Sequence, residues 1–173
     1  MRTTLSTLAL LGTIGLGTGA QAEEHEVKML NRGEDGQRMV FEPAHLKIEP
    51  GDTVNFVPTD KSHNAESILG MIPEGAEAFK GKINQEVSIT FDEIGLYGVK
   101  CMPHYAMGMV ALIEVGDELP NLDQAMEAKN PGQAAARMAL LLNEVGQEDA
   151  SGSDAADSGS TAAADSTGED ATE

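Results

Sequence analysis

Short runs of apolar and β-branched residues alternate with turn sequences over residues 23–116. Val87, Ile89 and Phe91, for example, are separated by single polar residues, which is the period of two of a strand with one face on a core. Gly, Pro, Asn and Asp, which favour turns, separate the runs. We expect strands at 26–30, 38–41, 45–48, 53–57, 86–91, 95–100 and 108–115. Strands of this length and spacing predict an all-β sandwich or barrel.

The pattern becomes helical after Gly116. Residues 121–128 and 131–145 have helical composition, and Pro131 suits a first helical turn. The second segment has apolar residues at helical spacing, namely Met138, Leu141, Leu142 and Val145. We therefore expect two short C-terminal helices within residues 117–149 that cover apolar surface of the sandwich.

The two ends of the chain have compositions that differ from that of the central part. Residues 1–22 combine a basic start, an apolar run and Ala20-Gln21-Ala22, which together indicate a secretory signal peptide cleaved after Ala22. The alternative is a permanent anchor, but the apolar run is shorter than the roughly 18 to 20 residues that cross a bilayer. We expect no membrane insertion after cleavage. Residues 150–173 contain only Ala, Ser, Gly, Asp, Thr and Glu, which predicts a disordered acidic tail.

Composition excludes several classes of function. Acidic residues outnumber basic ones 29 to 11, for a net charge of −18, which argues against nucleic acid and anionic lipid as partners. Aromatic residues are 3 % of the chain and Trp is absent, so no RNA-stacking platform is indicated. We interpret most of the acidity as a solubility device. One cysteine excludes an intramolecular disulfide, and an exported chain needs another role for a lone thiol.

That cysteine lies in a motif of metal-ligating residues. Cys101 is followed by His104, Met107 and Met109, and His63 lies in an upstream loop. Two imidazoles and a thiolate in one plane, with a long axial thioether, form the ligand set of a blue-copper electron-transfer site. Each residue alone is more often structural, but their combination in an exported chain indicates copper. Met107 and Met109 compete for the axial role.

Other functions fit the sequence less well. A copper-delivery protein needs an open, exchangeable site, and a closed set of one Cys, two His and one Met argues against that function. An enzyme is disfavoured because no Ser-His-Asp grouping, Gly-rich phosphate loop or carboxylate pair is present. We interpret His45 as structural and Met102 as a packing residue. Cleavage after Ala22 would expose Glu23-Glu24-His25, whose amine and imidazole are ligands for Cu(II), so metal binding at this terminus is an open question.

Four stretches of the chain match a known family, and they are 39–44, 50–54, 71–77 and 101–109. Through them the chain closely resembles the pseudoazurins, bacterial periplasmic electron carriers with the cupredoxin fold. The resemblance extends from Glu23 into the second predicted helix, and it implies an eight-stranded Greek-key sandwich that binds one copper ion. The ligands that it implies are His63, Cys101, His104 and Met109, so that Met109 is chosen over Met107.

The resemblance also assigns roles around the copper. It implies that His104 reaches the surface through an apolar patch, at or near which lie Met39, Pro103 and Met107. Asn64 follows the first ligand, and in the family its side chain is commonly tied to the hydroxyl of a Thr after the ligand Cys. Met102 stands at that position here and has no hydroxyl, which leaves the rigidity of the loop and the redox potential open.

The partners that the resemblance implies are periplasmic redox proteins, namely copper nitrite reductase or another denitrification reductase and c-type cytochromes. We expect this protein to be a monomer. Lys61 stands two residues before one implied ligand, and Lys100 directly precedes another. Arg32, Lys80 and Lys82 match family positions of basic residues around the copper face, so that together the five would form a basic ring. Such a ring would steer an acidic partner into a short-lived complex. The alternative is an ordinary scatter of surface lysines.

Overall fold

Two four-stranded sheets form the body of the protein. The structure, a computed structural model, describes residues 21–153. Residues 1–20 of the predicted signal peptide and residues 154–173 of the predicted tail lie outside the described residues. One sheet has the order β2-β1-β4-β6 and the other β3-β8-β7-β5. The strands are β1 (Glu24–Arg32), β2 (Arg38–Glu42), β3 (His45–Ile48), β4 (Asp52–Val57), β5 (Glu66–Ser67), β6 (Val87–Phe91), β7 (Gly95–Lys100) and β8 (Val110–Val115).

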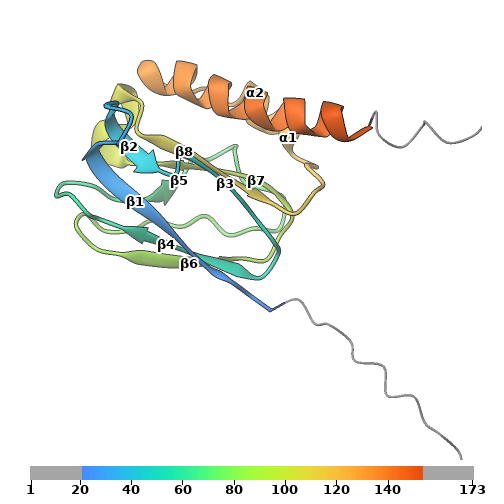
Figure 1. Ribbon diagram of the computed structural model, residues 1–173, viewed down its shortest axis with the longest axis horizontal. Helices are drawn as coiled ribbons and strands as arrows, with labels where there is room; N and C mark the ends of the chain where they lie inside the picture. Colours follow the sequence, from blue (N-terminus) through green and yellow to red (C-terminus); the bar gives the residue numbers. More distant parts are fainter. Residues whose placement is uncertain (1–20, 154–173) are drawn as a thin grey trace, which may run out of the picture.

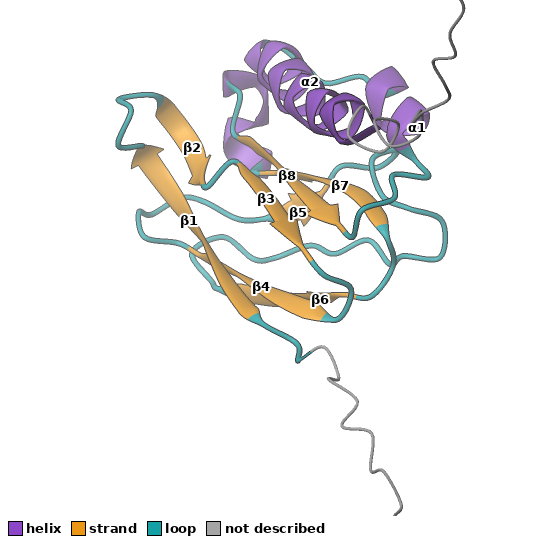
Figure 2. Ribbon diagram, turned by 45° about the vertical axis from the view of Figure 1, so that its right-hand side comes forward, coloured by secondary structure: helices purple, strands orange, loops and turns teal. Residues whose placement is uncertain are grey.

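The order of the strands is that of a Greek-key sandwich. β1 is parallel to β4 and β3 is parallel to β8, whereas all other neighbours are antiparallel. Consecutive strands β2 and β3 lie in different sheets, so the chain crosses between the layers there (Figure 2). The predicted all-β Greek-key sandwich is confirmed. Of the strands in residues 21–153, β5 alone was not predicted, because its two polar residues give no alternating pattern.

Burial along the strands explains the two layers. In β4, Val54 and Phe56 are fully buried and alternate with half-exposed residues, as a strand with one covered face requires. β8 is buried along its whole length. Ala111 and Ile113 belong to the core between the sheets, whereas Leu112 packs in a second core beneath the helices. Both faces of β8 are therefore covered.

Two helices cover the outer face of the sheet that contains β8 (Figure 1). They are α1 (Leu122–Glu127) and α2 (Gln133–Ser153). Asn121 attaches α1 to β7, because its Oδ1 accepts from the Leu96 N–H and its Nδ2 donates to the Leu96 carbonyl, both over 2.8 Å. α2 continues past the predicted end at residue 145. The apolar spacing ends at Val145, but backbone hydrogen bonds continue a helix without it.

Arg137 connects α2 to the rest of the fold. Its guanidinium donates to the carbonyls of Met39 at 2.9 Å, Gly108 at 2.8 Å and Arg38 at 3.0 Å. These carbonyls belong to β2 and to the segment that connects β7 with β8. The helix is therefore a support for that segment as well as a cover over the sheet. Within the described part of the chain, no helix has the length and apolar character needed to cross a membrane.

Candidate metal centre

The turn from β7 to β8 carries three of the predicted ligands. Cys101 directly follows β7, His104 lies in the 3₁₀ helix η1 (Met102–Met107), and Met109 immediately precedes β8. The Met109 N–H donates to the His104 carbonyl at 3.2 Å, and the Cys101 N–H donates to the Met109 carbonyl at 3.0 Å. Antiparallel pairing of the two strands thus closes the segment into a compact loop. His63 reaches the same place from the loop between β4 and β5.

Three side-chain donor atoms converge at this loop. His63 Nδ1 lies 3.1 Å from His104 Nδ1, and Cys101 Sγ lies 3.7 Å and 3.5 Å from these two nitrogens. Among the described residues, these three form the one group of at least three His, Cys, Asp or Glu side chains arranged to hold a metal ion. His63 and Cys101 are fully buried, whereas His104 is partly exposed.

The chemistry of this donor set fits copper. Burial raises the pKa of the Cys101 thiol, although hydrogen bonds from the backbone N–H groups of Asn64 and His104 oppose the shift. Burial, followed by the charge of His104, lowers the pKa of His63 and favours its neutral imidazole. Neutral imidazoles and a thiolate are ligands of copper, and a bound metal ion displaces the thiol proton. Copper bound here supplies one-electron chemistry between Cu(II) and Cu(I).

The structure distinguishes the two candidate axial residues by burial. Met109 is fully buried, whereas Met107 is 45 % exposed. Met109 also pairs through its backbone with both Cys101 and His104. These observations favour Met109 as the residue beside the three converging donors. Met107 instead lies on the surface of the same loop.

Asn31 holds the His63 ring, a role that the sequence analysis missed. His63 Nε2 donates to Asn31 Oδ1 at 3.1 Å, which leaves the lone pair on Nδ1, facing Cys101 and His104. Asp60 holds Asn31 in turn, since its Oδ2 accepts from the Asn31 N–H at 2.7 Å. The only available signal was that Asn31, a residue type that favours turns, follows the predicted strand 26–30, and that position does not identify a partner in a distant loop.

Asn64 remains attached to the ligand loop although residue 102 has no hydroxyl. Its Oδ1 accepts from the backbone N–H of Met102 at 2.9 Å, and its Nδ2 donates to the Gly81 carbonyl at 3.1 Å. The prediction that Met102 is a packing residue is wrong, because it is 52 % exposed. An exposed side chain is compatible with this position because the backbone N–H, and not the side chain, reaches Asn64.

The residues predicted at the surface patch differ in exposure. Pro103 and Met107 are exposed residues of η1, one before and one after the partly exposed His104 in the chain. Met39 is partly buried against the core between the sheets, and its carbonyl is held by Arg137. Pro103 and Met107 therefore offer apolar surface next to His104, whereas Met39 contributes mainly to the support of the loop.

The five predicted docking cations fall into two groups. Arg32, Lys61 and Lys82 are exposed, and no salt bridge involves them among the described residues. Lys80 and Lys100 lie 3.8 Å and 3.4 Å from the carboxylate of Glu66. The Lys100 side chain is only 16 % exposed and lies 5.0 Å from the centre of the Tyr105 ring. Its charge is largely balanced within the protein.

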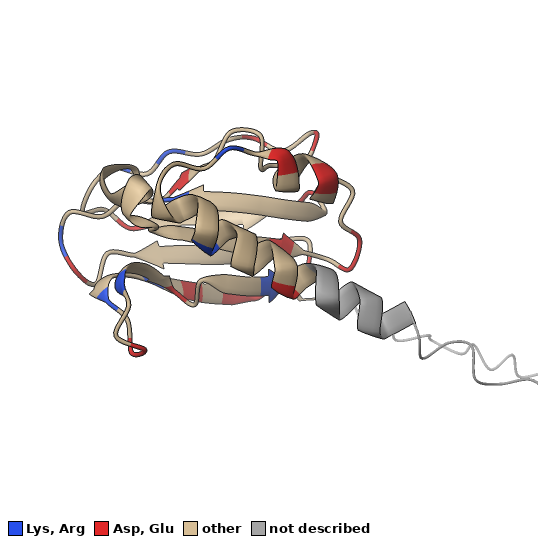
Figure 3. Cartoon of the chain, turned by 90° about the horizontal axis from the view of Figure 1, so that it is seen from above, with Lys and Arg blue, Asp and Glu red and all other residues tan. Residues whose placement is uncertain are grey.

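Acidic and basic residues are unevenly spread over the molecule (Figure 3). Many of the Lys and Arg positions lie toward the end of the sandwich that carries η1, although acidic positions lie there too. Carboxylates dominate the opposite end, where α1 lies. The copper end is thus less acidic than the rest of a strongly acidic chain.

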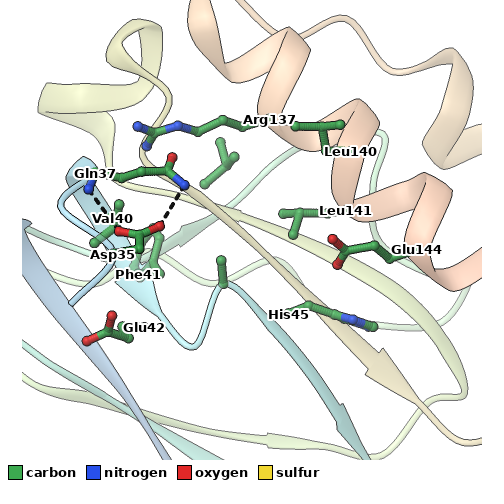
Figure 4. Close-up of a pocket in the computed structure, with 12 residues that line it drawn as sticks. Asp35, Gln37, Val40, Phe41, Glu42, His45, Arg137, Leu140, Leu141 and Glu144 are labelled. Atoms are coloured by element: carbon green, nitrogen blue, oxygen red, sulfur yellow. Dashed lines mark hydrogen bonds between the residues drawn. The ribbon is translucent and has the colours of Figure 1, made fainter. Parts of the chain in front are cut away.

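A cavity of about 330 Å³ between β2, β3 and α2 is separate from the metal centre. Figure 4 shows Asp35 on one side accepting both hydrogen bonds from Gln37, with His45 and Glu144 on the other side. His45 Nε2 lies 3.1 Å from the buried carboxylate of Glu114. That pairing agrees with the interpretation of His45 as structural. None of the predicted copper ligands lines this cavity.

The beginning of β1 is held by one carboxylate. Asp52 Oδ1 accepts from the Glu23 N–H at 2.7 Å, and Asp52 Oδ2 lies 3.0 Å from His25 Nε2. The Glu23 nitrogen that would bind Cu(II) at a cleaved terminus is thus already engaged. His25 also lies within β1, paired with Val54 of β4. Metal binding at this terminus would have to displace both interactions.

Comparisons with known proteins show that this chain is similar to copper-binding proteins. Residues 27–116 match the copper-binding proteins of the plastocyanin/azurin family. A pseudoazurin of Paracoccus pantotrophus is 54 % identical over 137 residues, covering 79 % of this chain and 94 % of that protein. Solved pseudoazurins from Methylobacterium extorquens AM1 and Hyphomicrobium denitrificans have TM-scores of 0.68 and 0.67 at 47 % and 49 % identity. Each covers 70 % of this chain, with 98 % and 97 % of the solved chains included.

Fold, donor group and these matches together define a copper-binding electron-transfer protein rather than an enzyme. Within the plastocyanin/azurin family, the chain belongs to the pseudoazurins. Its cofactor is copper, which the convergent His-Cys-His group suits.

Proposed function

We propose that His63, Cys101, His104 and Met109 bind one copper ion, and that the protein carries single electrons between redox proteins in the periplasm. The convergence of Cys101 Sγ with two imidazole Nδ1 atoms supports this ligand set. Full burial of His63, Cys101 and Met109 supports a permanently bound copper cofactor over copper carried for delivery, because a delivery site must open to release its metal. A signal peptide cleaved after Ala22 would bring the chain to that compartment.

The electron enters and leaves through His104. This imidazole is the one proposed ligand with exposed surface, so a docked partner approaches the copper most closely there. Exposed Pro103 and Met107 beside it exclude water from the contact. Burial of the other three ligands keeps their geometry similar in both oxidation states, which limits rearrangement when the electron moves.

The partner carries an acidic surface around its own redox centre. Arg32, Lys61 and Lys82 are exposed cations without an internal salt bridge among the described residues, so their charges are free to steer such a surface. Lys80 contributes less and Lys100 least, because both lie beside Glu66. The partner implied by the family resemblance is a copper nitrite reductase, with a c-type cytochrome as the alternative, and the protein acts as a monomer.

Stopped-flow kinetics with a copper nitrite reductase tests the docking surface. We expect Lys61→Gln and Lys82→Gln each to lower the second-order rate constant about two- to tenfold at low ionic strength, with the difference fading as salt screens the charges. Lys28→Gln is the matched control, because Lys28 is an exposed cation on β1 outside the proposed surface. Equal rate constants for all three variants at low salt would refute the docking surface and leave the copper site untouched.

A further inference from the structure

Glu66 is a buried carboxylate close to the metal centre. It lies in β5 and is only 5 % exposed. β5 pairs with β7, where Glu66 faces Lys100, and an isolated bridge places Lys80 opposite Glu66 on the other side. A buried carboxylate is unfavourable unless it is paired and hydrogen-bonded. The two lysines provide that pairing, at 3.4 Å for Lys100 and 3.8 Å for Lys80.

A chain of hydrogen bonds connects Glu66 to the copper loop. Its Oε2 accepts from Asn64 Nδ2 at 3.3 Å. This contact, with the bond from Asn64 Nδ2 to the Gly81 carbonyl, orients the amide so that Oδ1 accepts from the Met102 N–H at 2.9 Å. Met102 directly follows Cys101, and Asn64 directly follows His63. Glu66 therefore contacts neither proposed ligand but supports the residue next to each.

The charge of Glu66 acts on the same centre. A carboxylate held in a partly desolvated position interacts with a nearby ion more strongly than one in water. Reduction of Cu(II) adds one electron, and a fixed negative charge makes that addition less favourable. Lys100 directly precedes Cys101 and pairs with Glu66. Its positive charge has the opposite effect, because it makes the addition of an electron to Cu(II) more favourable.

We propose that Glu66 is a positioning residue that orients Asn64 and, together with Lys100, sets the equilibrium between Cu(II) and Cu(I). The proposal rests on the ligand set given above. Glu66 shifts the equilibrium toward Cu(II), Lys100 shifts it toward Cu(I), and the pair keeps the two effects nearly in balance. Hydrogen bonds and charges outside the ligand set are general means by which a protein tunes a metal.

A charge cycle tests the proposal. The copper-loaded protein is equilibrated with the hexacyanoferrate(III)/(II) couple, in which Cu(I) gives one electron to hexacyanoferrate(III) and forms Cu(II) and hexacyanoferrate(II). We expect Glu66→Gln to shift the equilibrium constant about three- to tenfold toward Cu(I), where tenfold is about 59 mV for one electron. Lys100→Gln shifts it in the opposite direction, and the double variant returns close to the unsubstituted protein.

Two further variants separate charge from position. Glu114→Gln is the matched control, since Glu114 is also buried and paired with a lysine, Lys47, but lies in β8 away from Asn64. It should leave the copper equilibrium unchanged. Glu66→Ala removes the acceptor for Asn64 and should alter the visible spectrum of the Cu(II) form, whereas Glu66→Gln keeps an acceptor and should preserve that spectrum.

The outcomes also separate this proposal from the copper site itself. Blue, copper-loaded single variants whose equilibrium constants equal that of the unsubstituted protein would overturn the role of Glu66 and leave the ligand set standing. The same holds if Glu66→Gln and Lys100→Gln shift the equilibrium in the same direction. Absence of a blue Cu(II) form in the unsubstituted protein would instead refute the ligand set.

Discussion

His63 donates from Nε2 to Asn31 Oδ1 over 3.1 Å, and this contact joins β1 to the loop that presents the first proposed ligand. Because an amide oxygen can only accept, the proton is placed on Nε2 and the lone pair of Nδ1 remains available. The orientation of the ring is therefore fixed before metal arrives. Asp60 makes the arrangement rigid by accepting from the Asn31 N–H at 2.7 Å.

Asn31→Ala should weaken copper binding about 10- to 100-fold, which is the usual effect of losing a residue that orients a ligand. The loss arises because the His63 ring gains freedom and both tautomers become accessible. A competition titration with a Cu(I) chelator measures it. Asn143→Ala, at an exposed position of α2, is the control and should bind copper like the unsubstituted protein. Equal affinities for the two variants would contradict the role given to Asn31.

An alanine at Gly108 should lower the free energy of unfolding more than an alanine at a glycine that has free space around it. Gly108 has φ 94°, and an added Cβ would lie 2.9 Å from Arg137 Cδ and 3.0 Å from its Nε. Gly70 has φ 89° but nothing within 4 Å of its added Cβ. We expect Gly70→Ala to lower the free energy of unfolding by about 1 kcal/mol through backbone strain. Gly108→Ala should add about 1–3 kcal/mol of overpacking.

Chemical denaturation of the copper-free variants measures this difference and avoids the contribution of bound metal. A loss that is the same for both alanine variants would mean that Arg137 moves aside freely. In that case the support of the ligand loop by α2 would be weaker than its three hydrogen bonds indicate.

Asp52 should make the free energy of unfolding depend on pH in the acidic range. The Glu23 N–H bonded to its carboxylate, aided by His25 and the Glu49 N–H, holds the pKa of Asp52 below its ordinary value of 3.8. A folded-state pKa below the unfolded value means that the contribution to stability is fully present above about pH 4 and is lost as pH falls through the folded pKa. Asp52→Asn removes this contribution. The difference in unfolding free energy between the protein and this variant should therefore be largest near neutral pH and shrink in acid.

Urea unfolding at several pH values between neutral and strongly acidic tests this prediction. Asp92→Asn, at an exposed position after β6, is the comparison and should show a smaller difference at neutral pH. A difference for Asp52→Asn that stays constant or grows as pH falls would show that Asp52 does not anchor the start of β1 electrostatically.

The sequence predicts local features of the fold well and contacts between distant segments poorly. Alternating residues such as Val87, Ile89 and Phe91 identify strands because burial of one strand face is recorded in the sequence itself. β5 and the full length of α2 leave no such record, since Glu66 and Ser67 are both polar and the apolar spacing of α2 ends at Val145. The Greek-key topology follows from the family resemblance and not from the pattern, and the order of the strands in each sheet is known only from the structure.

The same distinction holds at the metal centre. Cys101, His104 and Met109 stand close together in the sequence, so that their chemistry is visible as a motif. The contacts of Asn31 with His63 and of Lys100 with Glu66 join separate segments, and only the fold reveals them. The prediction for Met102 is wrong because an apolar residue beside a ligand suggests packing, whereas here its side chain is exposed and its backbone N–H makes the contact with Asn64.

The visible spectrum of the mature protein with one equivalent of Cu(II) tests the central proposal most directly. The account predicts an intense blue band from thiolate-to-copper charge transfer, which bleaches with ascorbate, returns on oxidation and is absent from Cys101→Ser. A pale solution with only weak Cu(II) absorption, or an intense band that survives in Cys101→Ser, would contradict the proposed site.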